Sequence, residues 1–133
     1  MRDQKDLRNI VARDPRYALE AYIFVLEALH HTRRKFHAPG HVTGQQLLDG
    51  IKDLALKRYG AMAKMVFEHW GITQTIDFGN IVINMVNEKV LSKTDEDKLE
   101  DFADIYDFND VFVKDYQPKF DHKQKRRRTK KFK

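Results

Sequence analysis

The side chains best suited to chemistry are the cations close to the end of the sequence. Residues 119–133 contain nine Lys and Arg against one Asp, a net charge of +8. Clustered Lys and Arg neutralise nucleic-acid phosphates, which makes binding depend on salt. Phe120 and Phe132 flank this run, and aromatic rings stack on unpaired bases. The predicted phosphate-binding residues are Lys123, Lys125, Arg126, Arg127, Arg128, Lys130, Lys131 and Lys133.

A second basic group lies earlier in the chain. Arg33, Arg34 and Lys35 follow two histidines and precede a Pro-Gly pair, so we expect them in a loop beside His30, His31 and His37. This loop would offer the nucleic acid a second contact on the folded body. Other interpretations of the basic regions stay open, namely a solvated terminus or contact with a membrane surface or an acidic protein.

Metal-binding and catalytic motifs are weak. His37 and His41 have a spacing that zinc sites use, but Pro39-Gly40 between them does not hold both on one helical face. The acidic run that begins at Asp95 lacks the glycine and the final glutamate of a calcium loop. The chain has no Cys, and it has no glycine-rich phosphate loop and no G-x-S-x-G motif. We therefore predict a non-enzymatic protein without a metal or cofactor.

Charge is divided unevenly along the chain. Residues 1–94 carry +4 and residues 95–118 carry −7, while the whole chain carries +5. The basic pI of about 9.4 therefore comes from residues 119–133. A length of 133 residues suits one domain with its own core. The absence of cysteine, of an apolar signal-peptide core and of a membrane-length apolar stretch leads us to expect a cytoplasmic protein.

Hydrophobic periodicity predicts helices over most of the chain. A short charged helix is expected over 3–12. Asp14-Pro15 is expected to cap the next helix, which is apolar around most of its circumference and therefore central. Thr43 and Gln46 have the spacing of a capping box, which predicts a helix that begins near residue 44.

The segment 70–91 has the most regular amphipathic pattern. Thr75 stands where an N-cap is expected, after a helix over 61–70 and a turn at Gly71. Helical spacing predicts a buried face for this segment that consists of Phe78, Ile81, Val82, Met85, Val86 and Val90.

The same helix–turn–helix layout is also compatible with DNA reading. The polar face of the second helix offers Asn80, Asn84 and Asn87, and amides suit base recognition. Asp77 and Glu88 on the same helix would repel phosphates. We therefore favour a structural role for this helix pair over sequence-specific DNA binding.

These elements predict an all-α fold of about five to six helices, with a centre that allows a winged-helix arrangement and Leu91 to Asp101 as the wing. Thr94 is expected to cap a further helix, and Phe108 and Phe112 are expected to fold back on the core. The predicted domain covers 1–117. Residues 118–133 are predicted to form a basic flexible tail, because they carry too little apolar surface to order themselves.

Three stretches carry a family resemblance: AYIFVLEAL, HVTGQQLLDGIKDLALKRYGAMAKMVFEHWGI and DFGNIVINMVNEKVLSKTDEDKLEDFADIYDFNDVF. They resemble an uncharacterised family of conserved hypothetical proteins from planctomycete and verrucomicrobial bacteria. The resemblance covers Ala21 to Phe112 and is most specific at HVTGQQLL and EHWGI. It implies a compact bacterial domain and carries over no catalytic residue or cofactor. The basic tail lies outside the family pattern.

The sequence thus predicts a non-enzymatic RNA-binding protein, ribosome-associated or bound to another ribonucleoprotein, that is anchored by its basic C-terminal arm. RNA is favoured over DNA because arginine-rich segments commonly fold on irregular RNA. The alternative is a protein-interaction adaptor that docks through the acidic and aromatic stretch 95–115.

Overall fold

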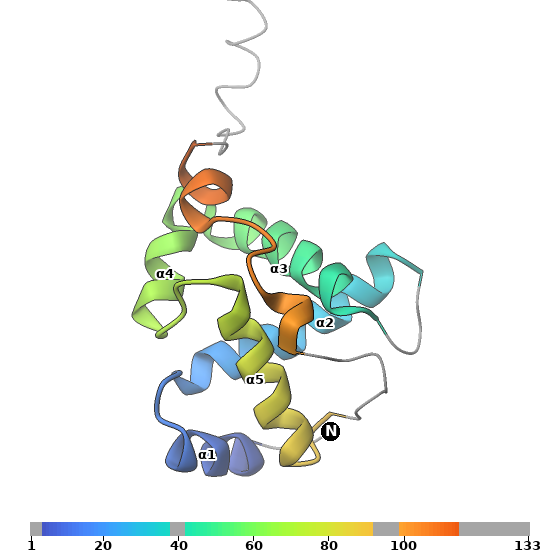
Figure 1. The fold of residues 1–133 in the computed structure, drawn as a ribbon, viewed down its shortest axis with the longest axis vertical. Helices are drawn as coiled ribbons and strands as arrows, with labels where there is room; N and C mark the ends of the chain where they lie inside the picture. The colour runs from blue at the N-terminus through green and yellow to red at the C-terminus, as the bar shows by residue number, and fades with distance from the viewer. Residues whose placement is uncertain (1–3, 38–41, 92–98, 115–133) are drawn as a thin grey trace, which may run out of the picture.

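The computed structural model describes residues 4–37, 42–91 and 99–114. Figure 1 shows helices that pack around one core, and the described residues include no β-strand, so the all-α prediction is confirmed. The elements in chain order are α1 (Gln4–Arg13), α2 (Leu19–Lys35), α3 (Gly44–Tyr59), the 3₁₀ turn η1 (Gly60–Met62), α4 (Ala63–His69), α5 (Thr75–Asn87), the 3₁₀ turn η2 (Leu99–Phe102) and the π-helical turn η3 (Asp110–Lys114).

The start of α2 differs from the prediction. Its N-cap is Ala18, which makes no side-chain capping bond, so Asp14-Pro15 does not begin the helix. The Asp14 carboxylate instead accepts hydrogen bonds from Arg16, at 2.9 Å from Nε and 2.7 Å from a terminal guanidinium nitrogen. The Ala18 amide donates to the carbonyl of Trp70 at 3.1 Å. The Trp70 carbonyl thus accepts a hydrogen bond from a backbone amide at the start of α2, in place of a capping side chain.

The start of α3 confirms the predicted capping box. Gln46 donates its amide to Thr43 Oγ1 at 3.0 Å, and the Thr43 amide donates to Gln46 Oε1 at 2.9 Å. Further along, α3 crosses α2 closely at Gly50, where an added Cβ would lie 1.8 Å from Thr32 Oγ1. The hydroxyl of Thr32 is satisfied within α2, because it donates to the Ala28 carbonyl at 2.6 Å.

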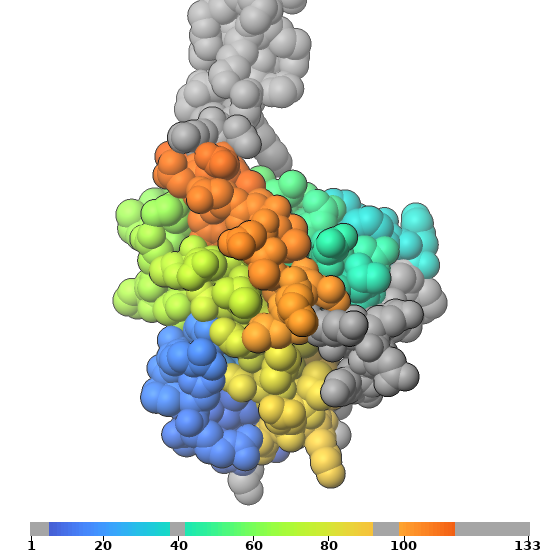
Figure 2. All heavy atoms as spheres, in the orientation of Figure 1, coloured from blue at the N-terminus to red at the C-terminus, as the bar shows by residue number. Residues whose placement is uncertain are grey.

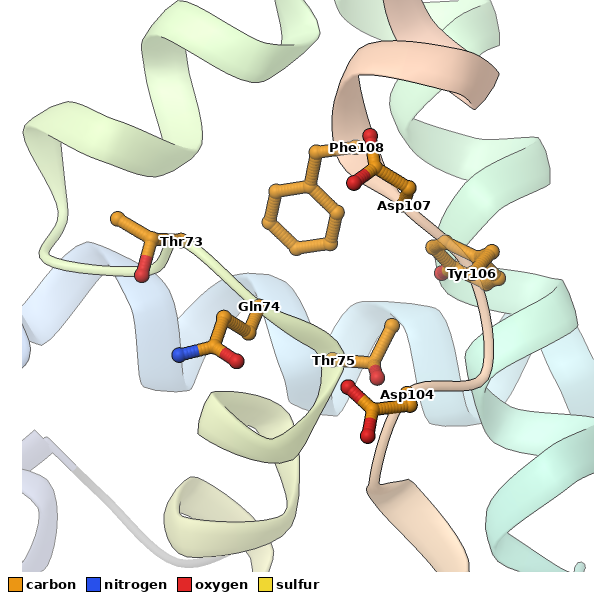
Figure 3. A pocket seen from close by; sticks show the side chains of 7 residues that line it. All are labelled: Thr73, Gln74, Thr75, Asp104, Tyr106, Asp107 and Phe108. Carbon is orange, nitrogen blue, oxygen red and sulfur yellow. The ribbon is translucent and has the colours of Figure 1, made fainter.

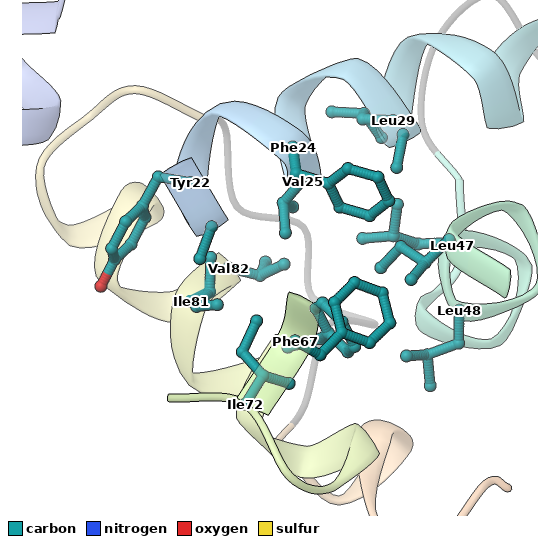
Figure 4. Close-up of a cluster of buried hydrophobic side chains, with 14 of the residues drawn as sticks. Tyr22, Phe24, Val25, Leu29, Leu47, Leu48, Phe67, Ile72, Ile81 and Val82 are labelled. Carbon is teal, nitrogen blue, oxygen red and sulfur yellow. The ribbon is translucent and has the colours of Figure 1, made fainter. Parts of the chain in front are cut away.

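The core lies between α2, α3, α4 and α5 (Figure 4). Phe67 on α4 is fully buried, and its ring centroid lies 5.2 to 6.0 Å from the rings of Phe24, Trp70, Phe78, Phe108 and Phe112. Tilted and edge-to-face pairs at these separations add to the stability that area burial supplies. Met62 of η1 and Met65 of α4 do not join this core, because they are 52% and 60% exposed.

The turn between α4 and α5 depends on Gly71. Its φ is +91°, and an added Cβ would lie 2.1 Å from the Arg16 carbonyl oxygen, so a side chain there would be strained and would clash. The N-cap of α5 is Gln74 and not Thr75 as predicted. Thr75 is buried, donates to the Phe102 carbonyl at 2.6 Å and accepts from the Ile105 amide at 3.1 Å. Its hydroxyl therefore joins α5 to the 99–114 segment.

The 99–114 segment closes the core. Phe102, Phe108 and Phe112 are buried, which confirms the prediction that the end of this stretch folds back. In Figure 2 the segment runs as a band over the surface between α3 and the side formed by α4 and α5. The proposed wing was Leu91 to Asp101. Residues 92–98 with Thr94 lie outside the described residues, and Leu99 to Asp101 form a 3₁₀ turn, which is not a strand.

Candidate nucleic-acid interface

The predicted tail contacts lie outside the part of the chain that the structure describes. This applies to Phe120 and Phe132, and to Lys123, Lys125, Arg126, Arg127, Arg128, Lys130, Lys131 and Lys133. The second predicted contact is described. Arg33, Arg34 and Lys35 form the last turn of α2, so their placement in a loop was wrong. The helix continues because the Phe36 amide still donates to the Thr32 carbonyl at 3.0 Å, and cations are favourable at a helix C-terminus.

Lys35 faces α3. Its ammonium group is 2.6 Å from a carboxylate oxygen of Asp49 and also pairs with Asp53 one turn later. The hydrogen bond to Asp49, supported by the one to Asp53, raises the pKa of Lys35. Its positive charge therefore serves the packing of α2 against α3, and it is a poorer phosphate contact than the sequence predicts.

The remaining basic side chains of this end of α2 surround one hollow. His30, Arg33, Arg34 and His37 line a volume of about 550 Å³. Both histidines and Arg34 are exposed, while Arg33 is partly buried. In Figure 1 this end of α2 lies on the side of the molecule away from α4. His31 does not line the hollow, and its Nε2 is buried without a hydrogen-bond partner in the described structure.

Two of the three α5 asparagines predicted to face outward, Asn80 and Asn84, are bonded within the protein, while Asn87 is exposed as predicted. Asn80 Nδ2 donates to the Tyr17 hydroxyl at 3.0 Å, and this hydroxyl donates to Asp77 at 2.6 Å. Burial and the hydrogen bond to Asp77 raise the pKa of Tyr17 to about 12. The amide of Asn80 therefore meets a buried phenol, and its outward placement was wrong.

Asn84 belongs to a neighbouring network that sequence reasoning missed. Its Nδ2 donates to Asp14 Oδ2 at 2.9 Å and to the Tyr22 hydroxyl at 3.0 Å. The hydrogen bond from Arg16, with a smaller one from Asn84, holds the pKa of Asp14 well below its usual range. The i, i+4 spacing of Asn80 and Asn84 was visible in the sequence, but their partners are more than 60 residues away.

The acidic segment has a different surface. Asp104 and Asp107 are exposed and help to line a smaller hollow of about 180 Å³. Figure 3 shows Thr73 and Gln74, from the chain entering α5, on the opposite wall. The phenylalanines of this stretch are buried, so the surface offered to a protein partner by 99–114 is mainly acidic.

Two further properties bear on the kind of site. Within 4–37, 42–91 and 99–114, no three His, Asp or Glu side chains come close enough together to hold a metal ion. No helix of these ranges has the length and hydropathy required to cross a membrane. His41, half of the weighed zinc pair, lies outside the described residues.

Comparison with known proteins supplies no family or fold relative: no protein-family model, no curated protein and no solved structure matches the chain. The bacterial family resemblance of the sequence therefore stays an expectation.

Proposed function

We propose that this protein binds RNA, either free structured RNA or RNA within a ribonucleoprotein such as the ribosome, and that residues 119–133 supply most of the affinity. The supporting observation is the separation of charge. Residues 119–133 carry +8, while residues 1–118 carry −3. A polyanion is therefore attracted to one end of the chain, and the binding releases counterions.

The ion pairs within the folded body support the assignment of most of the RNA affinity to residues 119–133. Several body cations are engaged with carboxylates, including Arg13 with Glu88, Arg58 with Glu27 and Lys35 with two aspartates of α3. Ion pairs of this kind leave less net positive charge for phosphates. The exposed Arg34 at the end of α2 extends the binding surface onto the body.

The test uses the full chain and replaces charge without removing residues. In the variant Arg126→Gln, Arg127→Gln, Arg128→Gln, we expect weaker binding to a fluorescent single-stranded RNA, measured by anisotropy across salt concentrations. The slope of log affinity against log salt should fall by about 2, because each lost contact removes about 0.7 for single strands.

The matched control is Arg8→Gln, Lys57→Gln, Lys89→Gln, which removes the same charge from exposed residues of the body. It should change the slope by less than the tail variant does. Equal slopes and affinities for the wild-type chain and the tail variant would contradict the proposal. Duplex DNA as competitor separates RNA preference from general polyanion binding, and cosedimentation with ribosomes tests the ribonucleoprotein target.

A further inference from the structure

The described lining of the hollow at the C-terminal end of α2 consists of basic side chains. Among the described residues, its walls are formed by two imidazoles and two guanidinium groups, from His30, His37, Arg33 and Arg34. No carboxylate of the described residues is part of this lining. Its volume is about 550 Å³, and it is open to solvent, because His30, Arg34 and His37 are exposed.

The backbone at His37 brings this lining together. Its φ is +52°, in the left-handed region, and its amide donates weakly to the Arg34 carbonyl at 3.4 Å. Glycine or asparagine is the common residue at such a helix end, since a side chain there costs about 1 kcal/mol. Here a histidine occupies the turn and faces the hollow with side chains of the preceding helical turns. Such backbone strain is often found at binding sites.

Phosphate at this position must be held by side chains. The carbonyl end of a helix carries partial negative charge, so the backbone of α2 does not attract an anion. Guanidinium groups bind phosphate oxygens in pairs, and they also stack on bases. Imidazole rings offer additional flat surfaces for an unpaired base. Arg34 and the two imidazoles therefore suit both halves of a nucleotide.

Lys35 follows Arg34 directly in the sequence, but it does not belong to the hollow. Asp49 and Asp53 hold its ammonium group against α3, and it does not line the hollow. The run Arg33-Arg34-Lys35 is thus divided by the helix into cations that face the hollow and one that joins two helices.

We propose that this hollow binds one unpaired ribonucleotide of the RNA, with the base stacked on the imidazole planes of His30 and His37 and the phosphate held by Arg34. The proposal rests on the proposed function and deepens it. The tail attracts RNA by charge, while the hollow recognises a nucleotide that is free of base pairing. The shared chemistry, a ribonucleoside monophosphate, also occurs in free mononucleotides, and the experiment distinguishes the two sources.

The test follows the imidazole signals of the full chain by NMR during titration with AMP, adenosine or inorganic phosphate. We expect AMP to shift the signals of His30 and His37 at concentrations at least tenfold lower than adenosine or phosphate. His69, exposed on α4, is the internal control and should not move. Unchanged His30 and His37 signals, or an equal response to phosphate alone, would overturn the proposal.

Variants connect the signals to the hollow. Arg34→Gln should weaken AMP binding at least fivefold, whereas the control Lys57→Gln, also exposed on a helix, should leave it unchanged. Equal effects of the two variants would overturn the assignment. An unchanged His69 signal in the Arg34 variant reports that the fold is retained.

A single-stranded tetranucleotide distinguishes the source of the ligand. If it shifts His30 and His37 at least tenfold more tightly than AMP, the RNA assignment is supported. Equal affinity would overturn that assignment in favour of a free mononucleotide. In the triple tail variant, RNA affinity should fall while the AMP response persists. If the tail variant loses the AMP response while its RNA affinity falls as expected, the hollow is rejected and the tail is retained. If its RNA affinity is unchanged while the AMP response persists, the tail is rejected and the hollow is retained.

Discussion

At the scale of single residues, Asp14 links three parts of the chain. It accepts hydrogen bonds from Arg16 and from Asn84, and Asn84 also holds Tyr22. The Asp14 side chain is 21% exposed and that of Arg16 is 57% exposed, so solvent screens much of their attraction. The network therefore positions the loop before α2 more than it stabilises the whole fold.

The depressed pKa of Asp14 predicts a pH dependence. The folded state binds the Asp14 proton more weakly than the unfolded state, whose pKa is about 3.9, so this stabilisation is complete above that value. It is lost as pH falls towards the folded-state pKa. The variant Asp14→Asn should therefore be less stable than the wild type at pH 7, and the difference should shrink below about pH 4.

Urea unfolding at a series of pH values measures this difference. Asp104→Asn is the control, because it removes the same charge from an exposed carboxylate outside the network. A stability difference for Asp14→Asn that stays constant from pH 7 to pH 2 would contradict the linkage.

At the scale of elements, the 99–114 segment is attached to α5 by close packing. An added Cβ at Gly79 would lie 2.9 Å from Leu99 Cδ1 and from two carbons of Phe102. The hydroxyl of Thr75 bonds the same segment four residues earlier on α5. The glycine thus allows η2 to approach the helix, and the threonine fixes its position.

This packing determines whether replacing Gly79 raises or lowers the free energy of unfolding. Alanine in a helix interior is normally favoured over glycine by about 1 kcal/mol. At Gly79 the clash with η2 should outweigh that gain, and we expect Gly79→Ala to lower the free energy of unfolding by about 1–3 kcal/mol. Chemical denaturation measures the change. Hydrogen exchange should also speed up at the Ile105 amide, and a stabilised variant would show that η2 does not pack here.

At the scale of the whole molecule, opposite charges lie in different parts of the chain. Residues 95–118 carry −7, and Glu100 and Asp104 are exposed in the described part of this stretch. Under the proposed function, this negative surface would repel the RNA that residues 119–133 attract, and the repulsion would be screened at high salt.

Neutralising part of this surface should therefore strengthen RNA binding. For the double variant Glu100→Gln, Asp104→Asn, we expect an affinity gain of roughly two- to fivefold at low salt. The gain should vanish near 0.5 M salt, where the Debye length is about 4 Å. Anisotropy with the same fluorescent RNA measures both conditions, and a gain that persists at high salt would exclude a screened charge effect.

The sequence alone determined the features that depend on neighbours along the chain. Helical periodicity and the Thr43–Gln46 capping box are local, because side chains three and four residues apart meet on any helix. Charge segregation is likewise a property of composition. These features were sufficient to predict an all-α fold and to single out the basic arm.

Only the tertiary structure decided which polar groups are left for a ligand. Periodicity placed Asn80 and Asn84 on an outer face, but their amides donate hydrogen bonds to the loop before α2 and to Tyr22. In the sequence Lys35 is equivalent to Arg34, but in the structure Lys35 forms an ion pair with Asp49 of α3. The physical reason is that hydrogen bonds and ion pairs form between groups close in space, and their separation in sequence does not reveal the partner.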